Sequence, residues 1–219
     1  MEFENYEREL KYLINNGKKC TSEKILNFLY QQGYKKKESF IKEKKETYYD
    51  DQSLTVLNRG DVMRGSNMVT EKFHGFLYKK NMCDSNKPYV SKLELGTKLR
   101  GQYKNVNEFI KELDLKLEEL KPILYANMIR EVTIIEKDRD CLYISYDKVK
   151  YFKENESDFI YEEMLEIEDW KNPNTTNVDY EYDKHLIEVN KLMIASNLPI
   201  SLTKDSKYYR GYILLNKRW

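Results

Sequence analysis

The chain has 219 residues, of which 34% are charged and 40% are apolar, enough for one domain with a sizeable buried core. Its 38 basic residues are balanced by 37 acidic ones, so the net charge is only +1. Proteins that coat nucleic acid or anionic lipid usually carry a basic excess, and this balance argues against either as the main partner. We expect a single domain over residues 1–219.

Cysteine usage and hydropathy bear on where the protein works. The three cysteines, Cys20, Cys83 and Cys141, include no C-x-x-C spacing, which suits a reducing compartment and supplies neither a disulfide framework nor a zinc site. No apolar run approaches the roughly 20 residues that a membrane-spanning helix needs. We therefore expect a cytoplasmic protein without a membrane segment.

The first predicted strand opens with the pattern Glu-x-Glu-x-Lys at Glu7, Glu9 and Lys11. Because side chains alternate along a strand, these three share one face, while Leu10 and Tyr12 point to the other. On an open sheet the charged face would simply meet water. Inside a closed barrel it would form a site for a divalent cation and the phosphate that the cation carries.

A helix and a densely charged stretch follow this strand. A hydroxyl N-cap and apolar residues at helical spacing predict a helix that ends near Gln32, before Gly33. Residues 35–45 combine many charges with few apolar side chains, and no element is predicted for them. Runs rich in Tyr, Val and Leu between turn residues then predict short antiparallel strands. These strands are predicted at 46–49, from Val62, at 75–80 and at 89–95.

The second half of the chain is predicted to contain three helices and three strands. Asn105 to Glu108 has the spacing of a capping box, and the leucines after it predict a helix that continues to Leu120 and ends at Pro122. The remaining predicted elements are a hairpin of strands 130–135 and 142–146, a strand at 159–168, a loop at 169–183, and helices at 184–196 and 207–215. With about eight strands and three or four helices, we expect an α+β fold.

Charged residues at a spacing of two recur on later strands. Lys92 and Glu94 share one face of their strand, and Glu166 and Glu168 share one face of theirs. A sheet with one face exposed to solvent would explain any single pair of these charged residues. Such pairs on both the first and the last long strands instead favour a closed barrel with charges inside. Buried charges are costly unless they are paired or bind a metal, so the carboxylates would hold hard cations and basic side chains would bind phosphate. The basic candidates are Lys11, Arg64, Lys79, Lys92 and Arg130.

The order of these motifs resembles the CYTH family, the triphosphate tunnel metalloenzymes, which include inorganic and thiamine triphosphatases and class IV adenylyl cyclases. The resemblance extends from Glu7 to about Arg210. Besides the opening Glu-x-Glu-x-Lys, it rests on Tyr48-Tyr49-Asp50, Leu57, Arg59-Gly60, Met63-Arg64, Lys79, Lys92-Leu93-Glu94, Arg130, Ile144 to Val149, Leu165 to Glu168 and Ser206-Lys207-Tyr208. Lys80 matches the family's strand lysine nearly as well as Lys79.

The resemblance implies a closed barrel of eight antiparallel strands that binds a small triphosphate with one or two Mg²⁺ or Mn²⁺ ions. The metal ligands that it implies are Glu7, Glu9, Asp147, Glu166 and Glu168. The implied phosphate-binding and catalytic residues are Lys11, Arg64, Lys79, Lys92 and Arg130, with Glu94 beside them in the substrate site. Among nucleic acids, only an RNA 5′ triphosphate end would suit such a site.

One residue departs from the family pattern, and the activity stays open among related chemistries. Ser66 stands where the family has the second arginine of Leu-Arg-x-Arg, which removes one phosphate contact. We expect hydrolysis of an inorganic, nucleoside or other organic triphosphate. The alternatives are a class IV cyclase that makes cyclic AMP and pyrophosphate from ATP, a non-catalytic binder of a phosphorylated ligand or RNA 5′ end, and, more distantly, a polyphosphate polymerase. A cyclase would also need a pocket for nucleobase and ribose, to which no residues are assigned.

Overall fold

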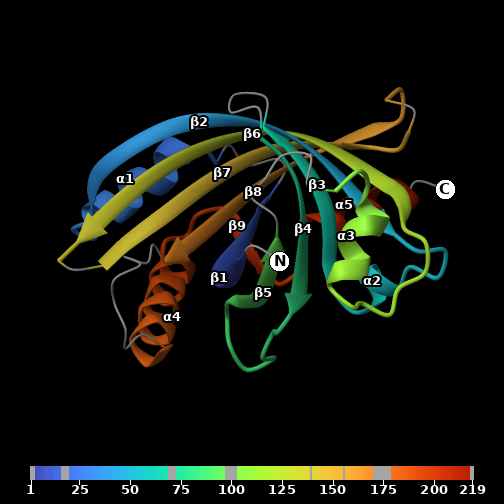
Figure 1. Ribbon diagram of the computed structural model, residues 1–219. Coiled ribbons are helices and arrows are strands. Elements are labelled where there is room, and N and C mark those ends of the chain that lie inside the picture. The colour runs from blue at the N-terminus through green and yellow to red at the C-terminus, as the bar shows by residue number, and fades with distance from the viewer. Residues whose placement is uncertain are drawn as a thin grey trace.

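The computed structural model describes residues 3–15, 20–68, 73–96, 103–138, 140–154, 156–169 and 179–217, which form nine strands and five helices (Figure 1). The strands are β1 (Phe3–Ile14), β2 (Lys35–Asp50), β3 (Val62–Met68), β4 (Phe73–Asn81), β5 (Val90–Gly96), β6 (Lys121–Lys137), β7 (Asp140–Phe152), β8 (Phe159–Asp169) and β9 (Ile200–Thr203). The helices are α1 (Ser22–Gln31), α2 (Thr55–Asn58), α3 (Val106–Glu112), α4 (Asp179–Ala195) and α5 (Lys207–Asn216). None of these helices is both long enough and apolar enough to cross a membrane.

Eight of the strands close into an antiparallel barrel, which confirms the predicted α+β barrel fold. The order around the barrel is β5-β4-β3-β2-β6-β7-β8-β1, and β1 pairs with β5 to complete the ring. The short strand β9 pairs with the last residues of β1, from Lys11 to Ile14, beyond the residues that pair with β5. Because of this closure β1 lies between β5 and β8, so its charged face has neighbours on both sides.

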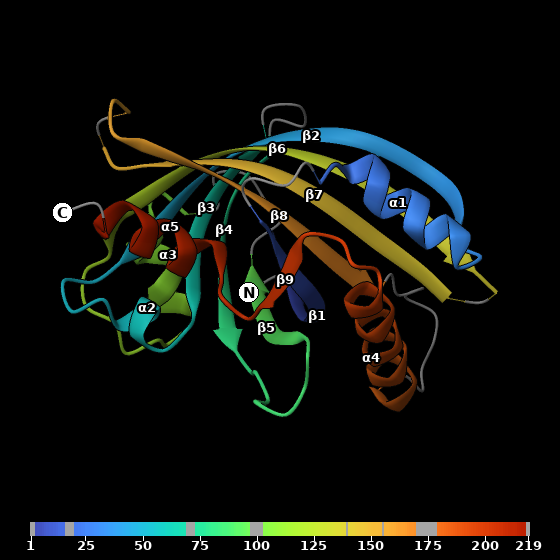
Figure 2. The same cartoon turned by 180° about the vertical axis from the view of Figure 1, so that it is seen from behind.

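The apolar face of β1 packs on the outside of the barrel. Leu10 and Tyr12 are 0% and 1% exposed and belong to one cluster with Ile25 and Leu29 of α1 and Leu186 of α4. Figure 2 shows α1 lying along the sheet beside β7, with α4 near the end of β8. Each buried Leu or Ile contributes about 1.5–3 kcal/mol to folding, so this packing fixes which face of β1 points inward. The other face, with Glu7, Glu9 and Lys11, is left to the interior.

Helix α5 packs against side chains that belong to the inner face of the barrel. The Tyr208 ring stacks on the Tyr48 ring of β2, with centroids 5.4 Å apart. At Gly211 a Cβ atom would come within 2.6 Å of Tyr151 and 2.7 Å of Leu124, so only glycine allows the helix to lie this close to β6 and β7. The first residues of α5 therefore reach the interior of the barrel.

The charged stretch for which no element is predicted forms the first part of β2, which begins at Lys35. The side chains of residues 35–39 are exposed, and fully buried positions appear only from Glu46 onward. A strand that extends into solvent has no apolar face, and so the pattern that identifies a strand in sequence is missing there.

The helix predicted to reach Leu120 ends at Glu112, and the prediction of its length was wrong. Asp114 adopts a left-handed backbone with φ of 48°, which a helix cannot contain. The Asn107 side chain also accepts a hydrogen bond from the Leu120 N–H at 2.8 Å and donates one to its carbonyl at 3.2 Å. These bonds turn the chain back toward α3.

Two further differences lie in the last third of the chain. Helix α4 begins at Asp179, inside the predicted loop 169–183, while residues 170–178 of that loop lie outside the described part of the chain. Strand β9 was not predicted, because four residues with two exposed side chains carry too short a pattern.

Candidate active site

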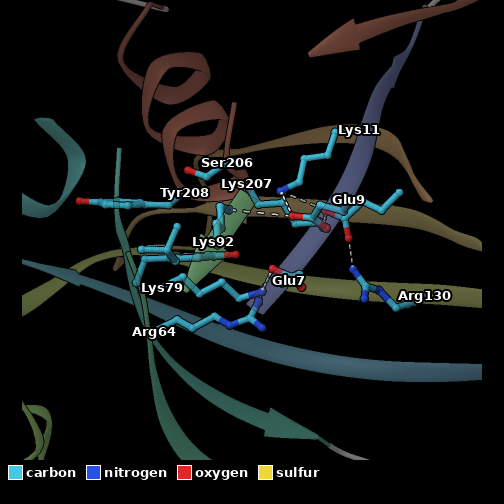
Figure 3. Close-up of a pocket in the computed structure, with 13 residues that line it drawn as sticks. Glu7, Glu9, Lys11, Arg64, Lys79, Lys92, Arg130, Ser206, Lys207 and Tyr208 are labelled. Atoms are coloured by element: carbon cyan, nitrogen blue, oxygen red, sulfur yellow. Dashed lines mark hydrogen bonds and ion pairs between the residues drawn. The ribbon is translucent and has the colours of Figure 1, made fainter. Parts of the chain in front are cut away.

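A charged cavity lies inside the barrel, lined by residues of seven strands and the start of α5. It offers only about 50 Å³ of free space, because charged side chains reach across it toward one another (Figure 3). The residues around it are Glu7, Glu9, Lys11, Tyr48, Val62, Arg64, Lys79, Lys92, Arg130, Glu166, Ser206, Lys207 and Tyr208. The five predicted phosphate-binding residues are all among them.

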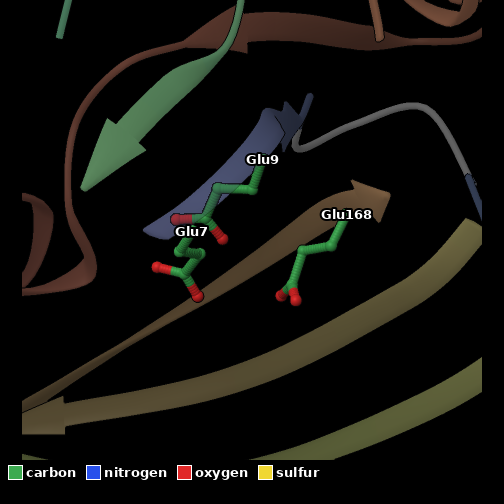
Figure 4. Close-up of side chains that lie close together, drawn as sticks. All are labelled: Glu7, Glu9 and Glu168. Carbon is green, nitrogen blue, oxygen red and sulfur yellow. The ribbon is translucent and has the colours of Figure 1, made fainter. Parts of the chain in front are cut away.

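Glu7, Glu9 and Glu168 form an acidic cluster, in which one carboxylate oxygen from each lies within 4.8 Å of the others (Figure 4). Glu7 and Glu9 share the inner face of β1, and the β1–β8 register places Glu168 directly opposite Glu9. Burial and the negative charges of Glu7 and Glu9 raise the pKa of Glu168 to about 8. Three convergent carboxylates suit a hard divalent cation, and these are three of the five predicted metal ligands.

The other two predicted metal ligands, Asp147 and Glu166, are held by cations. Arg130 donates from Nε and Nη2 to the two oxygens of Asp147, each at 2.7 Å, and from Nη2 to Glu166 at 2.5 Å. Lys207 of α5 forms ion pairs with Glu166 and, at 3.0 Å, with Asp147. We call these four side chains the inner ion-pair group. Lys11, which lies 2.8 Å from Glu9 and 3.4 Å from Glu166, connects this group to the acidic cluster.

Lys79 links the acidic cluster to β5. Its ammonium lies 2.6 Å from Glu7 and 2.5 Å from Glu94, and only 7% of the residue is exposed. Burial acts to raise the pKa of Glu7, but the Lys79 charge outweighs it and lowers that pKa. Lys80 is exposed on the outer face of β4, so Lys79 is the lysine that points inward.

Lys11 and Lys92 share Glu9 but differ in how well they are paired. Lys11 lies 2.8 Å from Glu9 and 3.4 Å from Glu166, and these carboxylates raise its pKa against the opposing effect of burial. Lys92 reaches Glu9 only at 4.0 Å, and burial together with the Lys11 charge lowers the pKa of Lys92 to about 7. Among the described residues, Lys92 thus has only this one long ion pair.

Arg64 is paired with an acid that sequence reasoning missed. Its Nη1 lies 2.8 Å from Glu46 of β2, which also accepts a hydrogen bond from the Tyr48 hydroxyl at 2.6 Å. Burial opposes ionisation, yet the Arg64 charge brings the pKa of Glu46 down to about 2. The Arg64 Nε is buried and has no hydrogen-bond partner among the described residues. One donor of this guanidinium is therefore left for a ligand.

One site residue that was not assigned from sequence, Glu46, could have been found by extending the period-two argument. Glu46 precedes Tyr48 by two residues, so it lies on the same face of β2. Lys207 lies in the Ser206-Lys207-Tyr208 motif, for which no role was assigned. Ser66 is half-buried on the inner face of β3, directly opposite Glu46. No sequence signal placed the start of α5 inside the barrel.

The inner surface as a whole carries nearly equal numbers of cations and carboxylates. Without a ligand they neutralise one another, as buried charges must. A ligand that contains both a metal ion and an anion could replace these ion pairs. Its metal ion would bind the carboxylates, and its anion would bind the cations. The described cations that form these pairs are Lys11, Arg64, Lys79, Lys92, Arg130 and Lys207, and the described carboxylates around them are Glu7, Glu9, Glu46, Glu94, Asp147, Glu166 and Glu168.

Solved structures with the same architecture come from several organisms. A Pyrococcus horikoshii protein aligns over 97% of this chain and 99% of its own, with a TM-score of 0.58 and 18% identity. A candidate adenylate cyclase from Bacillus halodurans aligns over 94% and 97%, with a TM-score of 0.56 and 15% identity. A candidate adenylyl cyclase from Hippeastrum, described as having a dominant triphosphatase activity, aligns over 93% and 95%, with a TM-score of 0.55 and 13% identity.

The likeness lies in structure and not in detectable sequence similarity. No protein-family model matches the sequence, and no curated protein matches it. Identities of 13–18% establish the fold alone. The chain has the fold of the CYTH, or triphosphate tunnel, proteins, as the order of its motifs predicts.

Proposed function

We propose that this protein hydrolyses a triphosphate inside its barrel with the help of a divalent metal ion. One observation carries the proposal: a closed barrel brings an acidic cluster and a set of buried cations together around one small cavity. Phosphoryl transfer needs little from a protein beyond positioning and charge stabilisation, so this arrangement already supplies most of a catalyst.

The acidic cluster fits the metal that this chemistry requires. Glu7, Glu9 and Glu168 would hold Mg²⁺ or Mn²⁺ through carboxylate oxygens, the ligands that such hard cations prefer. Bound there, the ion would neutralise charge on the triphosphate and activate the attacking water. Asp147 and Glu166 would serve as further ligands only after exchanging their cations, Arg130 and Lys207, for metal.

The cations of the cavity suit the triphosphate itself. Arg130 has a planar guanidinium that can bind two phosphate oxygens at once, and Lys11, Lys79 and Lys92 supply point charges from three different strands. The buried Arg64 Nε without a partner and the loosely paired Lys92 are donors that an anion would satisfy. These side chains would hold the phosphates in line and stabilise the charge that develops in transfer.

We favour hydrolysis over cyclisation. A cyclase must hold a nucleobase and a ribose so that the 3′ hydroxyl faces the α-phosphorus. The described lining of the cavity is mostly charged, and its two tyrosines, Tyr48 and Tyr208, already stack on each other. Hydrolysis needs only the charged lining and a water molecule.

A substrate panel tests this proposal. Purified protein is incubated with inorganic triphosphate, ATP or thiamine triphosphate and with Mg²⁺ or Mn²⁺, while orthophosphate, pyrophosphate and cyclic AMP are followed together. We expect metal-dependent release of orthophosphate. If ATP and Mn²⁺ give cyclic AMP and pyrophosphate faster than orthophosphate, the hydrolase proposal is wrong and the cyclase takes its place.

Two neighbouring lysines provide a matched control for the panel. Lys79→Met should lower kcat/KM by about 10- to 100-fold, the effect of losing one charge-assisted contact. Lys80→Met, one residue away on the outer face, should leave kcat/KM unchanged. Equal effects of the two substitutions would contradict the proposal that reaction takes place inside the barrel.

A further inference from the structure

The barrel contains one more cation, Lys44, which none of the recognised motifs includes. It lies on β2 two residues before Glu46, and the alternation of the strand turns it to the same inner face. The charges that act on its ammonium are those of Arg130, Glu46, Arg64 and Asp147, all groups of the barrel interior.

Lys44 differs from the other inner lysines because it has no counterion among the described residues. The two carboxylates near it are already engaged, Glu46 by Arg64 and Asp147 by Arg130. Burial and the Arg130 charge lower the pKa of Lys44 to about 7. An amine kept in this environment without an acid partner costs stability, a cost that an incoming anion would offset.

The register of β2 and β3 places Lys44 opposite Met68 and makes Ser66 its diagonal neighbour. Glu46 is directly opposite Ser66, so Lys44 is its diagonal neighbour on the same face. The buried Arg64 Nε, two residues from Ser66, also lacks a partner in the described part of the chain. Two unfilled donors, on Lys44 and Arg64, therefore lie on adjacent strands.

We propose that Lys44 is a phosphate-binding residue of the tunnel, which contacts the triphosphate next to Arg64 and supplies the positive charge that Ser66 does not. The inference rests on the proposed function, because it needs a polyphosphate inside the barrel. It identifies β2 as a strand that takes part in substrate binding.

Binding of imidotriphosphate, in which nitrogen replaces the bridging oxygens and prevents turnover, tests the inference by calorimetry in Mg²⁺. Lys44→Met should weaken binding by about 10- to 100-fold, and Lys44→Arg should bind nearly as well as the wild type. Lys45→Met is the matched control, since Lys45 is exposed on the outer face of β2 and should have no effect. The double variant Lys44→Met/Ser66→Arg should regain affinity, because arginine at 66 would place a cation beside the same position.

A thermal unfolding measurement separates binding from a structural role. Because Lys44 is partly buried and has no counterion in the described part of the chain, Lys44→Met should raise the melting temperature of the protein at pH 7 in the absence of imidotriphosphate while it weakens imidotriphosphate binding. If the wild type binds imidotriphosphate and Lys44→Met binds it equally well, the inference is wrong while the proposed function stands. If the wild type binds none, both are wrong. A double variant as weak as Lys44→Met would contradict the placement of Lys44 beside Ser66.

Discussion

Asp50 connects the barrel to α5, and its replacement should destabilise the fold strongly. This carboxylate is fully buried and accepts hydrogen bonds from the backbone N–H groups of Asp51, Val56 and Leu57, each at 2.9 Å. It also accepts the Tyr208 hydroxyl at 2.8 Å. Helix α2 is only four residues long and gets no side-chain cap from the residue before it. Asp51 accepts the N–H of Thr55, and Asp50 supplies the acceptors for the next two N–H groups of the helix.

The substitution Asp50→Asn keeps the shape of the side chain but replaces one acceptor oxygen with a donor. In one orientation the amide NH₂ would face the backbone N–H groups of Asp51 and Val56. In the other it would face the backbone N–H of Leu57 and the hydroxyl of Tyr208. An unsatisfied buried polar group costs about 1–3 kcal/mol, and the favourable charge on the acceptor is lost as well. We expect the free energy of unfolding to fall by about 2–5 kcal/mol.

Urea unfolding followed by circular dichroism measures this loss. Tyr208→Phe, which removes one of the four hydrogen bonds and leaves the carboxylate, should cost only about 1–2 kcal/mol. Glu43→Gln, an exposed carboxylate on the same strand, should change stability by less than about 0.5 kcal/mol. If Asp50→Asn is as stable as Glu43→Gln, the network around Asp50 does not hold α5 and the reasoning fails.

Three further predictions concern the site and one ion pair outside it. Glu9→Gln and Glu168→Gln should each lower turnover by orders of magnitude without changing the circular dichroism spectrum, and full activity in excess chelator would contradict the role assigned to the acidic cluster. Ser66→Arg should tighten imidotriphosphate binding, measured by calorimetry, and weaker binding would show that Ser66 faces no phosphate. Burial lowers the pKa of His185, but its hydrogen bond to Asp169 at 3.2 Å outweighs this and raises that pKa. The pair therefore stabilises the fold fully below about pH 6.5 and loses this effect as pH rises through the raised pKa, so Asp169→Asn should cost more stability at pH 6 than at pH 9. An equal loss at both values would contradict this.

The barrel could be predicted from sequence because a single strand, β1, carries enough information about both of its faces. Leu10 and Tyr12 are 0% and 1% exposed in the outer core, so Glu7, Glu9 and Lys11 must point the other way. The acidic pairs on the first and last long strands can then share one interior site only if those two strands are neighbours in the barrel. In the structure β1 and β8 are neighbours, and their register places Glu9 directly opposite Glu168.

The parts that could not be predicted lack such a two-sided pattern or depend on distant contacts. Residues 35–45 contain charges on both faces of β2, so Lys44 could not be assigned to the interior by alternation with apolar neighbours. The end of α3 is set by bonds between Asn107 and Leu120, thirteen residues apart, which override the helical spacing of the leucines between them. Lys207 enters the cavity because α5 packs against β6 and β7, which no local pattern encodes.

Sequence reasoning could also identify most of the charged groups of the cavity but not how they pair. Asp147 and Glu166 were assigned to metal because they are acids at the expected positions, yet here Arg130 and Lys207 occupy them. For these carboxylates to bind metal, their cations must find another anion, and the phosphates are the anions that would be present. Metal and triphosphate would thus each release the partner that the other needs, and thermodynamic linkage requires that each then raises the affinity of the barrel for the other. The nearly balanced charges of the interior therefore favour a ligand that brings both signs of charge, as the proposed metal–triphosphate complex does, over either component alone.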